Sequence, residues 1–130
     1  MTYILLADSD STVRTALRML LSRRLPGSNL DEADDWATLQ QKMKAAHPDL
    51  LLLDWRLHDR PDCTALRDWI QAAQPMRVAG MSIEPDDRGL VLAAGAQMFV
   101  YKGESPERVI RQLQDLVDSQ PISNFQSPEA

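Results

Sequence analysis

The sequence lacks several features that would decide its class at once. It has a single cysteine, Cys63, in 130 residues, so an internal disulfide is excluded. No apolar run approaches the roughly 20 residues of a membrane span, and no apolar segment follows a basic start as in a signal peptide. A net charge of -5 argues against direct binding of nucleic acid. We therefore predict a cytoplasmic protein without its own nucleic-acid or membrane contact.

The apolar content is sufficient for one sizeable core, at 44% of the residues. We predict one domain over residues 1–118. Residues 119–130 have no helical stripe, and we interpret them as a flexible tail or the start of a linker. The two histidines have no partner at zinc-ligand spacing, so a zinc site is not expected.

Short apolar runs predict five strands. The clearest is the run of four leucines over 50–53, which fits a strand buried on both faces and ends at Asp54. The other predicted strands are Tyr3–Ala7, Ser28–Ala33, Met76–Met81 and Met98–Tyr101.

Helical periodicity and capping residues predict five helices between and after these strands. The first begins at Asp10 or Ser11 and stops before Pro26-Gly27. The others cover Asp35–Ala46, a segment ending near Pro75, a segment from Pro85 to Gly95, and a final helix capped by Ser105. Alternating strands and helices predict an α/β fold with a doubly wound parallel sheet.

Four polar residues should meet at one edge of this sheet. Asp8, Asp54, Ser82 and Lys102 each follow an apolar strand within about one position, and ligands of such sheets bind at the carboxyl ends of the strands. Two nearby carboxylates favour a divalent cation such as Mg²⁺. With the ion bound, an aspartate can attack a phosphoryl group while the lysine offsets the charge that develops.

The order of these motifs resembles a response-regulator receiver domain over about residues 1–118. The motifs are an acid after the first strand, Pro48-Asp49 before the leucine run and Asp54, a Ser after the fourth strand, and Phe99 to Lys102. The resemblance implies a flavodoxin-like receiver fold with strand order 2-1-3-4-5, in common with the doubly wound example of that order. The segment 102–107 is similar to the subgroup with a helix-turn-helix output domain, which would follow the tail.

The resemblance also implies a role for each site residue. Asp54 corresponds to the phosphoryl-accepting aspartate, and Ser82 and Phe99 correspond to the switch hydroxyl and switch aromatic. The remaining matches are Asp8 as a metal-binding acid, the backbone carbonyl of Arg56 as a metal ligand, and Lys102 as the family's lysine.

Two positions depart from the family's pattern. Ser9 stands where the family usually has a second acid, so we expect weaker Mg²⁺ binding unless Asp10 supplies a ligand instead. Gly103 follows the lysine where many relatives have proline, which predicts a more mobile loop.

The leading hypothesis is therefore a two-component signalling switch that is not itself an enzyme. A sensor histidine kinase or phosphotransfer protein would phosphorylate Asp54 with Mg²⁺, and the change would reach a downstream effector, a linked output domain or a homodimer partner. The alternative is a degenerate receiver that acts as a phosphorylation-independent interaction module. A flavin or nucleotide site would need a phosphate-binding loop that the sequence lacks, and a two-aspartate phosphatase would want an acid at Arg56.

Overall fold

The computed structural model describes residues 2–118, which form one parallel sheet and its covering helices. The sheet has five strands in the order β2-β1-β3-β4-β5, as predicted. The strands are β1 (Tyr3–Ala7), β2 (Asn29–Ala33), β3 (Leu50–Asp54), β4 (Arg77–Ser82) and β5 (Met98–Tyr101). The helices are α1 (Ser11–Arg24), α2 (Trp36–Ala45), α3 (Cys63–Ala72), the 3₁₀ turn η1 (Pro85–Asp87), α4 (Arg88–Ala93) and α5 (Pro106–Asp118).

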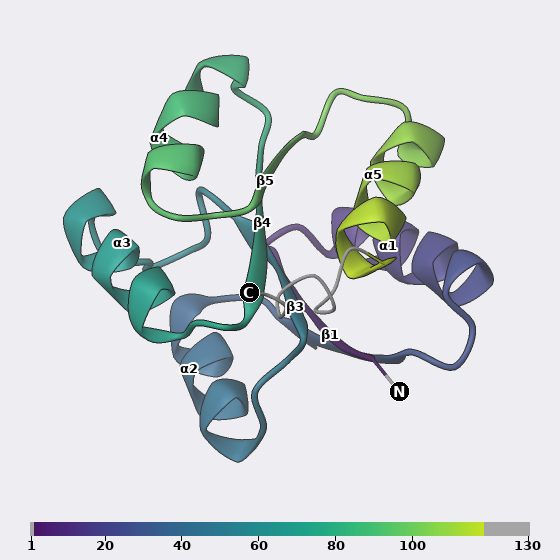
Figure 1. Ribbon diagram of the computed structural model, residues 1–130, viewed down its shortest axis with the longest axis horizontal. Coiled ribbons are helices and arrows are strands. Elements are labelled where there is room, and N and C mark those ends of the chain that lie inside the picture. Colours follow the sequence, from purple (N-terminus) through teal and green to yellow (C-terminus); the bar gives the residue numbers. More distant parts are fainter. Residues whose placement is uncertain (1, 119–130) are drawn as a thin grey trace, which may run out of the picture.

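The helices form two layers, one on each side of the sheet. Figure 1 shows α1 and α5 on one side of the strands and α2, α3 and α4 on the other. Residues of β3 alternate between these layers: Leu50 and Leu52 pack in the cluster of α1 and α5, and Leu51 and Leu53 pack in the opposite cluster. All five residues of β3 are buried, as expected for a central strand with helices on both faces.

The local capping chemistry explains where several helices begin. The Asp10 side chain accepts a hydrogen bond from Thr12 N at 2.8 Å, so Asp10 rather than Ser11 is the N-cap of α1. Asp35 and Asp62 cap α2 and α3 in the same way. Ser105 Oγ accepts from Arg108 N at 3.3 Å, which agrees with the predicted cap of α5.

The segment after β4 differs from the single helix predicted from Pro85 to Gly95. It begins with the 3₁₀ turn η1, and only Arg88–Ala93 is α-helical. The fixed φ of Pro85 is compatible with either type of first turn, so the sequence pattern did not distinguish them. The turn places Asp87 in a buried position close to the end of β4.

The predicted tail, residues 119–130, lies outside the described residues. Within residues 2–118, none of the helices combines the length and apolar character that crossing a membrane requires.

Candidate functional site

Two carboxylates and one ammonium meet at the carboxyl edge of the sheet. Asp8 follows β1, Asp54 ends β3, and Lys102 follows β5. Lys102 Nζ lies 2.6 Å from Asp8 Oδ2 and 3.4 Å from Asp54 Oδ1. The strands β1, β3, β4 and β5 are adjacent in that order and parallel, so their carboxyl ends lie at one edge of the sheet. Residues about 50 positions apart in the sequence are brought together there.

Asp8 is held by its own loop and by α1. Its Oδ1 accepts from Asp10 N at 2.9 Å, and its backbone carbonyl accepts from Arg14 Nη1 at 2.6 Å. Its Oδ2 is buried and contacts the Lys102 ammonium without an aligned hydrogen bond. Burial raises the pKa of the Asp8 carboxyl above its ordinary value, and Lys102 and Asp10 N offset only part of that rise.

Asp54 is buried but not sealed, because 9% of its side chain remains exposed. Its Oδ1 accepts from Arg56 N at 3.0 Å, and Leu57 N donates to the Asp54 carbonyl at 3.0 Å. The loop after β3 therefore turns directly over the carboxylate and brings the Arg56 backbone next to it. Trp55 is buried on the side of α3 and α4, where it belongs to the core cluster.

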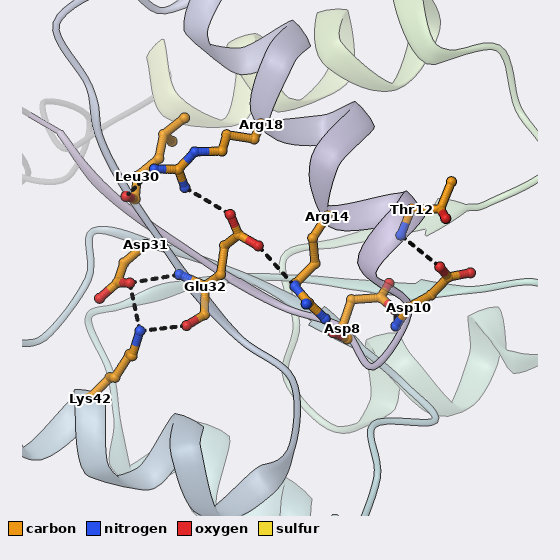
Figure 2. Close-up of polar contacts among 9 residues, drawn as sticks. All are labelled: Asp8, Asp10, Thr12, Arg14, Arg18, Leu30, Asp31, Glu32 and Lys42. Carbon is orange, nitrogen blue, oxygen red and sulfur yellow. Dashed lines mark hydrogen bonds and ion pairs between the residues drawn. The ribbon is translucent and has the colours of Figure 1, made fainter.

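Ser9 and Asp10, the two candidates for a further acid at this edge, have other partners. Ser9 Oγ accepts from His58 N at 3.0 Å and so supports the loop after β3. The exposed Asp10 carboxylate turns to the backbone of Thr12, as Figure 2 shows. In this arrangement the Asp10 side chain serves α1 and does not join Asp8 and Asp54.

Ser82 has a partner that the sequence analysis did not identify. Its hydroxyl donates to Asp87 Oδ2 at 2.6 Å and accepts from Glu84 N at 3.0 Å. Asp87 Oδ2 also lies 3.3 Å from Arg56 Nη2. A chain of polar contacts therefore links the end of β4, the turn η1 and the loop after Asp54.

Phe99 and Tyr101 lie two positions apart in β5 and differ in exposure. Phe99 is buried in the cluster of α2, α3 and α4, whereas Tyr101 is exposed. The Tyr101 ring packs over Gly103, where an added Cβ atom would overlap the ring. Glycine at this position therefore makes room for the ring, a reason different from the loop mobility that the sequence suggested.

The family model of the response regulator receiver domain matches residues 4–114. The chain belongs to this family. The predicted resemblance is thus confirmed, and family membership supports a role in two-component signalling. The sequence matches no curated protein sequence.

Solved structures with the same fold include several receivers. A CheY-like receiver domain protein from Methanospirillum hungatei has a TM-score of 0.81 at 18% identity, covering 95% of this chain and 99% of that one. The signal receiver domain of the putative response regulator NarL from Mycobacterium tuberculosis has a TM-score of 0.76 at 24% identity, covering 92% and 98%. A LuxR-family DNA-binding response regulator from Staphylococcus aureus has a TM-score of 0.76 at 13% identity, covering 89% and 98%. These similarities confirm the receiver fold.

The receiver pocket offers a small oxygen donor set for a divalent cation. The buried Oδ2 of Asp8 has no aligned hydrogen bond, and the Asp54 carboxylate and the Arg56 backbone lie beside the same pocket. Hard oxygen donors of this kind suit Mg²⁺. Among residues 2–118, however, no three acidic, histidine or cysteine side chains gather as a metal-binding group. The described residues therefore offer Mg²⁺ a suitable set of oxygen ligands, but with two carboxylates and no third acidic side chain.

Proposed function

We propose that this receiver is a phosphorylation switch in which Asp54 accepts a phosphoryl group from a histidine kinase or phosphotransfer protein. The observation that carries the proposal is the Lys102 ammonium, which contacts both Asp8 and Asp54 at the carboxyl edge of the sheet, where 9% of the Asp54 side chain is exposed. Such a cation can offset negative charge on phosphoryl oxygens. The receiver would act as a phosphoacceptor rather than as an enzyme with a separate substrate.

In the proposed transfer, an Asp54 carboxylate oxygen attacks phosphorus, the phosphorus–nitrogen bond of a phosphohistidine breaks, and the imidazole nitrogen leaves with the electron pair. Arg56 N and Lys102 Nζ both contact Oδ1, so Oδ2 is the oxygen that we expect to attack. The product is an acyl phosphate on Asp54. Lys102 then pairs with the new phosphoryl oxygens, and Ser82 is the hydroxyl that donates to them.

We propose Asp8, Asp54 and the Arg56 backbone carbonyl as Mg²⁺ ligands, with Asp10 remaining the cap of α1. Bound Mg²⁺ would supply charge stabilisation for the transferring phosphoryl group. The protein's own contribution is to keep the Asp8 carboxylate in place through Asp10 N and the Arg14 contact to the Asp8 backbone. With Ser9 in place of a second acid, we expect affinity below that of a three-carboxylate pocket.

The decisive experiment is intact mass spectrometry after incubation with a small-molecule phosphodonor and Mg²⁺. We expect the wild-type chain to gain the mass of one phosphoryl group and Asp54→Asn to gain none. Asp59→Asn is a matched control, because Asp59 is an exposed acid in the same loop, and it should be labelled like the wild type. Labelling of folded Asp54→Asn would contradict the assignment.

A second candidate is the degenerate receiver that binds its partner without phosphorylation. Ser9 and the two-carboxylate pocket favour it, because Lys102 alone already balances one of the two negative charges. This candidate predicts no mass gain for the folded wild-type chain, and Mg²⁺ affinity equal to that of Asp8→Ala. The same labelling experiment therefore separates the two functions.

The remaining assignments concern the surroundings of the receiver. LuxR-family response regulators share its fold at low identity, which supports our proposal of a linked helix-turn-helix output domain. A cytoplasmic location, a homodimer and the division into residues 1–118 and 119–130 stay predictions.

A further inference from the structure

We propose that Asp87 is a positioning residue that holds the Ser82 hydroxyl away from Asp54 in the unphosphorylated receiver, with Arg56 as its anchor. The inference deepens the proposed function and rests on phosphorylation of Asp54. It assigns to the turn η1 a part in the switch that the Ser82 hydroxyl alone does not explain.

The argument begins with the hydrogen-bonding capacity of Ser82. A hydroxyl has one hydrogen to donate, and Ser82 donates it to Asp87 Oδ2 at 2.6 Å. The Ser82 oxygen also accepts from Glu84 N at 3.0 Å. The hydroxyl therefore cannot donate to a phosphoryl oxygen until its bond to Asp87 breaks.

The bond to Asp87 is of a strong type. Its acceptor is a carboxylate, the donor–acceptor distance is short, and only 7% of Asp87 is exposed. Arg56 Nη2 at 3.3 Å adds a second, charged partner, although 60% of the Arg56 side chain faces solvent. Asp87 thus has two donors, one from the end of β4 and one from the loop after Asp54.

A phosphoryl group on Asp54 would compete for both donors. Asp54 of β3 pairs in register with Met81 of β4, and Ser82 is the next residue of β4. Ser82 therefore lies beside the end of β3 that carries the phosphoryl-accepting aspartate. The Arg56 backbone already contacts the Asp54 carboxylate. Phosphoryl oxygens at Asp54 would therefore attract the guanidinium and the hydroxyl together.

Loss of both donors would leave the Asp87 carboxylate buried without a partner. This state is unfavourable, because an unpaired carboxylate in a protein interior lacks the hydration it has in water. We expect the turn η1 and the start of α4 to move so that Asp87 reaches solvent. Phosphorylation is in this way coupled to movement of the segment 85–93.

The test uses beryllofluoride with Mg²⁺, a phosphoryl mimic, and measures its affinity by calorimetry for the full chain. We expect Asp87→Ala to bind about tenfold more tightly than the wild type, because the hydroxyl no longer has a charged competitor. Asp87→Asn should show a smaller gain, since a neutral amide is a weaker acceptor. Asp86→Ala, which removes the exposed neighbouring acid, is the matched control and should bind like the wild type.

A double-mutant cycle separates positioning from a general structural effect. In the Ser82→Ala background, Asp87→Ala should no longer increase affinity. A gain that persists without the hydroxyl overturns the proposal, as does unchanged or weaker binding in both Asp87 variants. If Asp87→Ala lacks a cooperative unfolding transition and so is not folded, the beryllofluoride affinity of Asp87→Asn decides whether the proposal holds.

The two levels of the proposal fail differently. Equal binding by the wild type and the Asp87 variants removes the positioning role and leaves the phosphoacceptor function standing. If none of the folded forms binds beryllofluoride, both the phosphoacceptor function and the role of Asp87 are wrong. Binding by Asp87→Ala alone would support the positioning role in its strongest form.

Discussion

Ser9 occupies a position next to Asp8 at which an acid would add negative charge to the site. It lies beside Asp8, yet its hydroxyl accepts a hydrogen bond from His58 N and contributes no charge. The carboxylates of Asp8 and Asp54 therefore face Lys102 with no third acid among residues 2–118 to help them hold a cation.

We predict that Ser9→Asp increases Mg²⁺ affinity on the order of tenfold, because the number of charged oxygen ligands sets the affinity of such sites. The measurement is a Mg²⁺ titration followed by calorimetry. Ser9→Asn, of similar size but neutral, is the matched control and should leave the affinity near that of wild type. An equal gain from the two substitutions would show that charge at position 9 is not what limits binding.

Residues at the ends of apolar runs were predictable, and those placed by turn geometry were not. Asp8, Asp54, Ser82 and Lys102 could be identified because each is polar after a buried strand and parallel strands end at one edge. Asp87 appeared only as part of a helix start. Its contact with Ser82 depends on the 3₁₀ geometry of η1, and its contact with Arg56 depends on the loop after β3. Neither the turn nor the loop produces a periodic pattern of apolar residues from which the contact could be predicted.

At the scale of elements, the edge strand β2 is held by charged side chains from both helical layers. Glu32 pairs with Arg14 and Arg18 of α1 at 2.9 Å each, and Asp31 pairs with Lys42 of α2 at 2.7 Å. Figure 2 shows the two acids turned to opposite sides of the strand. Charged residues on an edge strand also discourage pairing with another chain. These ion pairs explain how the segment Ser28–Ala33, which has few apolar residues and was predicted as a strand, forms β2.

We predict that Asp31→Asn lowers the free energy of unfolding near neutral pH by less than about 1 kcal/mol, because solvent screens this half-exposed pair. Burial opposes ionisation of Asp31, but its contacts with Lys42, Glu32 N and Tyr3 together hold its pKa below the ordinary value. The stabilisation is therefore complete above the ordinary aspartate pKa and is lost as pH falls through the folded-state value.

The measurement is urea unfolding of wild type and Asp31→Asn at neutral and at acidic pH. The difference between them should shrink in acid. Asp34→Asn changes an exposed acid just after β2 and should leave stability unchanged at either pH. A difference for Asp31→Asn that is constant with pH would exclude a role for its ionised form.

At the scale of the whole molecule, the sheet separates two hydrophobic clusters. One joins the strands to α1 and α5, and the other joins them to α2, α3 and α4. The alternation of leucines in β3 serves the two clusters equally. The sequence predicted this arrangement because a run buried on both faces requires helices on each side.

We predict that Leu52→Ala lowers the free energy of unfolding by about 2–5 kcal/mol, because it leaves a cavity in a closely packed cluster. Leu52 is fully buried against α1 and α5. Leu90→Ala is the matched control, since 53% of Leu90 is exposed, and it should cost far less. Chemical denaturation with a single-transition fit measures both. A similar loss for both variants would contradict the assigned core.

The packing of Tyr101 over Gly103 couples the two positions that flank Lys102. A side chain at position 103 would overlap the Tyr101 ring where the ring now lies. Alanine or proline after the lysine therefore requires that the exposed ring turns away or that a smaller residue replaces it. The glycine thus decides which conformation the neighbouring ring can keep, and with it what covers the loop beside the lysine.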